Sequence, residues 1–244
     1  MPTNTTDTSP RVAVILPTYN EAENIIPLIE AVLQQDADRE FTVVVVDDNS
    51  PDGTAELVRD AMQSESRLDL ITRAGKLGLG TAYIAGYRRA LERGCEWILS
   101  MDADWSHNPE HIPEILSRTG GADMVIGSRY VAGGGLRDWP MHRKLLSAAA
   151  NRMARAVLRI KTRDCTSGYR CYRAEFLRKI PLDEITSDGY SFLIDLLYRF
   201  IQAEARIAES PILFTDRKGG VSKISKTEIF KALKTLWTLY FHHA

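Results

Sequence analysis

Short apolar segments alternate with longer segments of mixed polarity through the first half of this chain. Arg11 to Leu16 is β-branched, Phe41 to Val46 is apolar throughout, and the stretch between them repeats its apolar residues with a period near 3.6. Strands that alternate with helices form a mostly parallel sheet with right-handed crossovers and helices on both faces. We therefore predict an α/β fold with a doubly wound central sheet. The expected strands are 11–16, 41–46, 68–72, 97–101 and 123–127.

Polar side chains cluster just beyond the carboxyl ends of these strands, where open α/β sheets place their binding sites. They are Thr18, Tyr19, Glu21, Asp48, Lys76, Asp102, Asp104 and Arg129. The run Gly78-Leu79-Gly80 is too short for a dinucleotide-binding fingerprint, and the sequence contains no Walker A motif. This pattern predicts a nucleotide-type crevice and disfavours hydride transfer and P-loop chemistry. Lys76, which lies beside glycines, either reaches a phosphate or is simply solvated.

Asp102 and Asp104 follow the apolar strand that begins at Trp97. Residues two apart on a strand point to the same side, so both carboxylates can face one ligand. Close carboxylates repel each other unless a cation lies beside them, and a hard divalent ion that also binds phosphate oxygens resolves this repulsion. The alternative is an Asp pair that caps the following helix.

The composition is that of an ordinary globular protein, 44% hydrophobic and 26% charged with a formal net charge of −1. Nucleic-acid binding is disfavoured because the chain is not basic overall. Three cysteines without a C-x-x-C pair indicate a reducing compartment. No apolar run reaches the ~18 residues of a membrane span, and residues 1–10 lack the features of a signal peptide. We expect a cytoplasmic protein, soluble or peripheral to a membrane, with a disordered segment at residues 1–10.

The second half contains a basic segment, Trp139 to Arg163, with seven Lys and Arg residues and no acidic one. Its apolar residues repeat at helical spacing, which predicts either a helix at an anionic membrane surface or a helix that packs its apolar face on the core. An antiparallel strand near Tyr172, helices at 175–180 and 190–202, and an edge strand at 206–215 are expected to follow. Pro211 suits an edge strand because it lacks the N–H that an inner strand uses.

The C-terminal part is expected to form a loop and a helix. Residues 216–227 are polar and contain glycines, a composition that suits a lid over a phosphate. Residues 226–244 are expected to form an amphipathic helix with an aromatic face. That face either lies in the headgroup region of a membrane, packs on the transmembrane helix of a small partner protein, or docks on the chain's own domain. The expected division is one α/β domain at 11–225 followed by this helix.

Several motifs resemble those of the family 2 inverting glycosyltransferases, which have the GT-A (Rossmann-like) fold. They are Pro17-Thr18-Tyr19-Asn20-Glu21, Asp47-Asp48-Asn49-Ser50-Pro51-Asp52-Gly53-Thr54 and Asp102-Ala103-Asp104. Further motifs resemble the polyprenol (dolichol) phosphate mannose synthase branch: Gly127-Ser128-Arg129-Tyr130, Trp139-Pro140 and Arg143-Lys144-Leu145-Leu146-Ser147. The resemblance extends over nearly all of residues 11–225. It implies transfer of mannose from GDP-mannose to a polyprenyl (dolichyl) monophosphate with inversion.

The same resemblance implies roles for the residues of the donor site. Pro17, Tyr19 and Glu21 are expected to hold the base and ribose. Asp48, Lys76 and Ala103 belong to the same nucleotide-sugar site. Asp102 and Asp104 are expected to bind Mg²⁺ or Mn²⁺ and, through it, the diphosphate. Ser106 occupies the position of a third metal contact, where relatives often have Gln.

On the acceptor side, Arg129, Arg143 and Ser147 match the residues that bind the acceptor phosphate. Arg217 and Lys223 match a mobile loop that closes over the donor. A phosphate monoester has a second pKa near ~6 and is already anionic at pH 7, so it needs cations to hold it rather than a base to deprotonate it. Asp188 is the remaining candidate base, but its place before the 190–202 helix favours a helix cap.

Two alternative functions stay open at this point. One is a polyprenyl-phosphate glucosyltransferase that uses a UDP-sugar, since the motifs do not identify the base or the sugar. The other is a nucleotide-sugar-binding subunit without catalysis, which the intact Asp102, Asp104, Arg129 and Arg143 disfavour.

Overall fold

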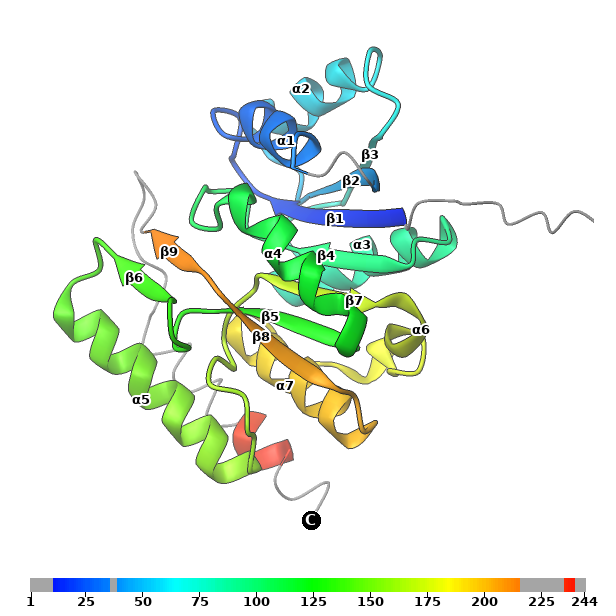
Figure 1. The fold of residues 1–244 in the computed structure, drawn as a ribbon. Coiled ribbons are helices and arrows are strands. Elements are labelled where there is room, and N and C mark those ends of the chain that lie inside the picture. Colours follow the sequence, from blue (N-terminus) through cyan, green and yellow to red (C-terminus); the bar gives the residue numbers. More distant parts are fainter. Residues whose placement is uncertain (1–10, 36–38, 216–234, 240–244) are drawn as a thin grey trace, which may run out of the picture.

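A seven-stranded sheet in the order β3-β2-β1-β4-β7-β5-β8 forms the centre of the protein (Figure 1). The structure is a computed structural model that describes residues 11–35, 39–215 and 235–239. The strands of this sheet are β1 (Arg11–Thr18), β2 (Glu40–Asp47), β3 (Leu68–Thr72), β4 (Trp97–Ser100), β5 (Met124–Ser128), β7 (Arg170–Arg173) and β8 (Ile207–Pro211). Its strand pairs are parallel except those of β7, which lies antiparallel between β4 and β5. The predicted α/β fold is confirmed, and so is the antiparallel strand near Tyr172.

Helices cover both faces of the sheet (Figure 1). They are α1 (Ile25–Leu33), α2 (Thr54–Ala61), α3 (Leu79–Glu92), α4 (Ile112–Ser117), α5 (Met141–Leu158), α6 (Ala174–Leu177) and α7 (Tyr190–Gln202), with 3₁₀ turns at Pro109–His111, Arg118–Gly121 and Leu182–Glu184. Side chains alternate between the two faces along a strand. Val12, Val14 and Leu16 of β1 therefore pack in one core cluster, with residues of α1, α2 and α4. Ala13 and Ile15 pack in the other, with residues of α3, α5, α6 and α7. A strand covered on both faces is apolar at nearly every position, as the sequence of β1 is.

The predicted edge strand at 206–215 is wrong in its extent. It divides into β8, which pairs with β5 at the edge of the main sheet, and β9 (Leu213–Thr215). β9 pairs instead with β6 (Gly135–Arg137) in a separate two-stranded sheet beside α5 (Figure 1). The division follows Pro211, which cannot donate a backbone hydrogen bond. The helix expected at 175–180 is shorter than predicted, because α6 ends at Leu177 and Pro181 follows closely.

The basic segment forms α5, whose two halves differ in burial. Towards its C-terminal end, Ala154 and Leu158 pack in the core cluster of α3 and α7. Towards its N-terminal end, the side chains of Met141 and Leu145 are 69% and 64% exposed. The core-packed alternative therefore holds for the second half of the helix, while the first half presents apolar side chains to the outside.

The predicted terminal helix lies mostly outside the described residues, as do the segment 1–10 and the loop at 216–227. Residues 235–239 are helical, and Leu236 and Leu239 are buried in the same core cluster as α7, whereas Trp237 is exposed. Within the ranges that the structure describes, no helix is both long and apolar enough to span a membrane. The division of the chain at residue 225 stays a prediction.

Candidate active site

A cavity of about 400 Å³ opens at the carboxyl ends of β1, β2, β4 and β5. Its wall contains every described residue of the predicted donor and metal site except Ser106: Pro17, Tyr19, Glu21, Asp48, Lys76, Asp102, Ala103 and Asp104. Arg129 of the predicted acceptor site lines the same cavity. Arg143 and Ser147 are not among its lining residues. Arg217 and Lys223 lie outside the described residues.

Asp102, just beyond the end of β4, is held by two residues that the sequence analysis did not identify. The Tyr83 hydroxyl of α3 donates a hydrogen bond to its Oδ1 at 3.1 Å. Its backbone N–H donates to Nδ1 of His107 at 2.9 Å. Burial lowers the pKa of His107, against the opposing effect of the Asp102 and Asp104 carboxylates. The imidazole is therefore neutral at pH 7, as an acceptor nitrogen requires.

Asp104 is fixed by the turn that follows it. Its Oδ1 accepts hydrogen bonds from the backbone N–H of Ser106 at 3.1 Å and from the Ser106 hydroxyl at 2.5 Å. Trp105, between them, has a positive φ of 62°, a strained conformation for a bulky residue. Ser106 is 3% exposed, and its hydroxyl proton is directed at Asp104. In this arrangement Ser106 orients a carboxylate, and its predicted contact with a metal stays untested.

The cavity wall also carries an aromatic ring and a lysine. The Lys76 ammonium lies over the Tyr19 ring, 4.1 Å from its centroid, a cation–π arrangement. Asp48 forms a buried ion pair with Arg73, whose Nη2 also donates to the carbonyl of Gly78 at 3.0 Å. Arg73 was not predicted, because nothing in its local sequence indicates that it reaches the neighbouring strand end. It ties the loop before α3 to the end of β2.

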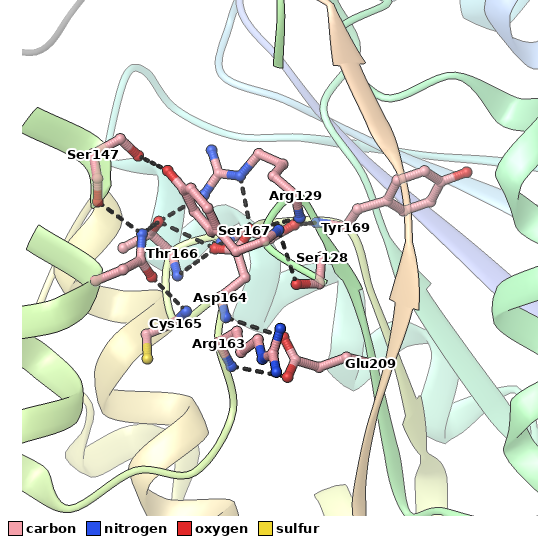
Figure 2. Close-up of polar contacts among 12 residues, drawn as sticks. Ser128, Arg129, Ser147, Arg163, Asp164, Cys165, Thr166, Ser167, Tyr169 and Glu209 are labelled. Atoms are coloured by element: carbon pink, nitrogen blue, oxygen red, sulfur yellow. Dashed lines mark hydrogen bonds and ion pairs between the residues drawn. The ribbon is translucent and has the colours of Figure 1, made fainter. Parts of the chain in front are cut away.

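Arg129 follows β5 and is buried in a polar network (Figure 2). Its Nε and Nη2 donate to the two oxygens of Asp164 at 2.7 and 2.8 Å, and Nη2 also donates to Thr166 at 2.7 Å. Burial alone would lower the pKa of Arg129, but Asp164 raises it, so the guanidinium stays charged. Arg143 of α5 stacks on Trp139, with 4.2 Å from its guanidinium carbon to the ring centroid. Ser147 accepts a hydrogen bond from the Tyr130 hydroxyl at 2.8 Å.

The interpretation of Asp188 as the cap of the following helix is wrong. The N-terminal cap residue of α7 is Gly189, and no side-chain hydrogen bond caps this helix. Asp188 instead accepts a hydrogen bond from the backbone N–H of Gly80, at the start of α3, at 3.2 Å. It lines the cavity, and a side chain at Gly78 would collide with its carboxylate. The pairing joins residues 108 positions apart, which no local pattern indicates.

The carboxylate pair fits a hard divalent cation that shares its coordination with a ligand. Asp102 and Asp104 both line the cavity, and the side chain of Asp102 is 36% exposed. Carboxylate oxygens suit Mg²⁺ and Mn²⁺, and Mg²⁺ usually binds to one or two carboxylates together with water and substrate phosphates. Over the part of the chain that the structure describes, no cluster of three or more His, Cys, Asp or Glu side chains could hold a metal. The protein itself would thus supply part of the coordination, and a diphosphate in the cavity could supply more.

A mostly parallel sheet that ends at a polar cavity, with paired carboxylates at one strand end and basic side chains in the same cavity wall, is the arrangement of the GT-A fold. Solved structures agree. Glucosyl-3-phosphoglycerate synthase from Mycobacterium tuberculosis, in complex with Mn²⁺, UDP and phosphoglyceric acid, is 18% identical with a TM-score of 0.69, over 95% of this chain and 78% of that chain. The same enzyme with Mg²⁺ and UDP gives a TM-score of 0.67 at 18% identity, over 95% and 80% of the two chains. At this identity the likeness shows the fold.

The sequence comparisons identify the family. The model of glycosyl transferase family 2 matches residues 13–181. A polyprenol monophosphomannose synthase of Mycolicibacterium smegmatis is 45% identical over 91% of this chain and 84% of its own length. An undecaprenyl-phosphate mannosyltransferase of Micrococcus luteus is 46% identical over 88% of both chains. The protein belongs to glycosyl transferase family 2.

Proposed function

We propose that the protein transfers mannose from GDP-mannose to a polyprenyl (dolichyl) monophosphate with inversion, and so forms polyprenyl-phosphate-mannose and GDP. The two relatives named for mannosyl transfer to polyprenyl phosphates support this choice of sugar and acceptor. The observation that carries the proposal is the shared cavity. A carboxylate pair, Lys76 and Arg129 line this one cavity. Transfer of a sugar from the diphosphate of a donor to the phosphate of an acceptor requires such groups close together.

The donor's nucleotide is assigned to the part of the cavity wall that Tyr19 and Lys76 form. The Tyr19 ring, under the Lys76 ammonium, offers a flat apolar surface to a base or ribose. Pro17, Glu21 and Asp48 line the same cavity. Lys76 would supply a positive charge to the diphosphate of such a donor.

The carboxylate pair is assigned to a divalent cation, Mg²⁺ or Mn²⁺. Such an ion stabilises the negative charge that develops on a departing diphosphate. The protein's part is to hold the two carboxylates ready. Tyr83 and His107 fix Asp102, and the Ser106 turn fixes Asp104. Groups fixed in advance need little reorganisation when charge develops.

The acceptor phosphate is assigned to the side of Arg129, with Arg143 and Ser147 of α5 farther from the cavity. A phosphate monoester is anionic at neutral pH, so its oxygen is a nucleophile without a general base. Planar guanidinium groups bind such an anion in a defined orientation. In inverting transfer this oxygen attacks the sugar carbon from the face opposite the diphosphate, so the two anions must enter from different sides.

A lipid acceptor also requires a route from a membrane. The first half of α5 exposes Met141, Leu145 and Leu146, and α5 contains basic but no acidic residues. Basic helices with exposed apolar side chains bind anionic membrane surfaces. We assign α5 to the cytoplasmic face of a membrane, with a small transmembrane protein as a further candidate partner. The roles of Arg217 and Lys223 in closing over the donor remain part of the same proposal.

Radiolabelled donors test the proposal directly. The protein is incubated with polyprenyl phosphate, Mn²⁺ and either GDP-mannose or UDP-glucose, and label in the lipid phase is counted. We expect lipid-linked label from GDP-mannose alone. Lipid-linked label from UDP-glucose would show that the donor assignment is wrong. No label from either donor would favour a nucleotide-sugar-binding subunit without catalysis. Anomeric analysis of the product by NMR then tests inversion.

A further inference from the structure

Asp164 is a buried acid that the proposed transfer does not use directly. It lies in the loop between α5 and β7 and is 0% exposed. A buried carboxylate without a partner is strongly destabilising, so the group that pairs with Asp164 shows how its charge is accommodated. Burial would raise the pKa of Asp164, but Arg129 holds it below its usual value. The acid is therefore ionised and paired with a residue of the cavity wall.

The pairing fixes the guanidinium of Arg129 in both position and plane. The two carboxylate oxygens accept from Nε and Nη2, and the backbone N–H of Arg129 donates to the same carboxylate at 3.1 Å. Thr166 accepts a further hydrogen bond from Nη2. The rings of Tyr130 and Phe214 each lie 5.5 Å from the guanidinium carbon. Among the described residues, the remaining nitrogen, Nη1, has no hydrogen-bond partner, and Figure 2 draws no dashed line to it.

The same network reaches the helix that carries the other predicted acceptor residues. Asn151 of α5 donates to Thr166 at 3.1 Å and accepts the backbone N–H of Cys165 at 2.7 Å. It also donates to the carbonyl of Ser147 at 3.0 Å. The loop that orients Arg129 is therefore attached directly to α5.

We propose that Asp164, assisted by Thr166, is a positioning residue that leaves one nitrogen of Arg129 available to an oxygen of the acceptor phosphate. This role rests on the proposed function, because it presumes a phosphate acceptor beside Arg129. A guanidinium with two nitrogens bound by the protein has little freedom left, so the third can form a hydrogen bond without ordering a flexible side chain. A purely structural ion pair would stabilise the fold without affecting acceptor binding.

Acceptor binding in a soluble assay separates these two roles. The full chain is titrated with farnesyl phosphate and, separately, with GDP and Mn²⁺, and Kd is measured for each by calorimetry. In Asp164→Asn the side-chain amide would face a guanidinium N–H, so two donors oppose each other and the plane of Arg129 is lost. We expect the Kd for farnesyl phosphate to rise about tenfold or more and the Kd for GDP to change less than about twofold. An unchanged or lower Kd for farnesyl phosphate would overturn the positioning role.

A matched pair at Thr166 keeps the test decisive if Asp164→Asn does not fold. Thr166→Val removes the hydroxyl with little change of shape, whereas Thr166→Ser keeps it. We expect acceptor binding to weaken about threefold or more in the valine variant and to match the wild type in the serine variant. Equal affinities in both variants would contradict the proposal. If the wild-type chain binds GDP but no farnesyl phosphate, the proposed function itself fails, and the role of Asp164 falls with it.

Discussion

His107 offers the sharpest test of how the carboxylate pair is held. It is 1% exposed, and its Nδ1 accepts the backbone N–H of Asp102. Its ring packs against Tyr169 and Phe214, with centroids 4.9 and 5.3 Å apart. His107→Phe keeps an aromatic ring in this slot and removes the acceptor. His107→Asn does the reverse, because its amide oxygen can occupy the place of Nδ1 while the ring is lost.

The magnitude follows from the lost hydrogen bond. A buried N–H left without an acceptor costs about 1–3 kcal/mol. If the chain avoids this cost by turning the peptide at Asp102, the carboxylate moves and transition-state binding falls by the same free energy, about 5- to 150-fold in kcat/KM. If the chain keeps its geometry, the cost appears as stability, and Tm falls by about 2–4 °C for each kcal/mol.

Two measurements on each variant decide the matter: Tm by calorimetry, and kcat/KM for sugar transfer at saturating Mn²⁺. We expect His107→Phe to lose activity, stability or both within these ranges and, if it loses activity, His107→Asn to retain more. The reasoning is refuted if His107→Phe matches the wild type in both measurements, or if His107→Phe loses activity and His107→Asn loses as much.

Three further predictions concern other residues. Asp104→Ala should abolish turnover while the circular dichroism spectrum stays that of the folded protein. Near-normal activity would contradict the assignment of Asp104 as a metal ligand. Arg143→Ala should raise the acceptor KM about tenfold with little change in nucleotide affinity, and equal loss of both would contradict its role. Burial lowers the pKa of His111 below the usual 6.5, and its Nε2 accepts the N–H of Leu213 at 3.1 Å. As the pH falls, His111 is therefore protonated in the unfolded chain before it is protonated in the folded one. The stability that neutral His111 contributes is full above about pH 6.5 and is lost as the pH falls towards the lower pKa of the folded state. In urea unfolding between about pH 7.5 and 5.5, the wild type should lose more stability than His111→Gln, and equal losses would exclude this contribution.

The fold and most of the residues that line the cavity could be predicted because their signals are local. A buried strand followed by polar residues is visible in a few consecutive positions, as at Asp102 and Asp104, and the family motifs extend this to Tyr19 and Glu21. The parallel arrangement then gathers the strand ends at one edge of the sheet. The strand pattern thus predicted correctly that polar residues at the ends of β1, β2 and β4 lie in the wall of one cavity, whereas their donor roles come from the family resemblance and stay predictions.

The features of the site that the sequence did not predict depend on contacts formed only in the folded chain, most of them between distant segments. Arg129 was expected to be a cation awaiting a phosphate, but it is paired with Asp164, 35 residues later in the chain. Asp188 was expected to serve its own helix and instead contacts α3. His107 lies close to Asp102 in sequence, yet only the turn at Trp105 brings its Nδ1 to the Asp102 N–H. Such pairings follow from the completed packing, so single-sequence patterns do not show them.

The contact between Asp188 and the start of α3 has a consequence for how a donor is oriented. The amino end of a helix attracts anions, and in many nucleotide-binding folds a phosphate occupies it. Here a carboxylate of the protein lies at that place. If a diphosphate binds in the same cavity as proposed, Asp188 would repel it, while Lys76 and a cation held by Asp102 and Asp104 would attract it. On the proposed function, repulsion by Asp188 would therefore help to orient the donor, together with attraction to the cations.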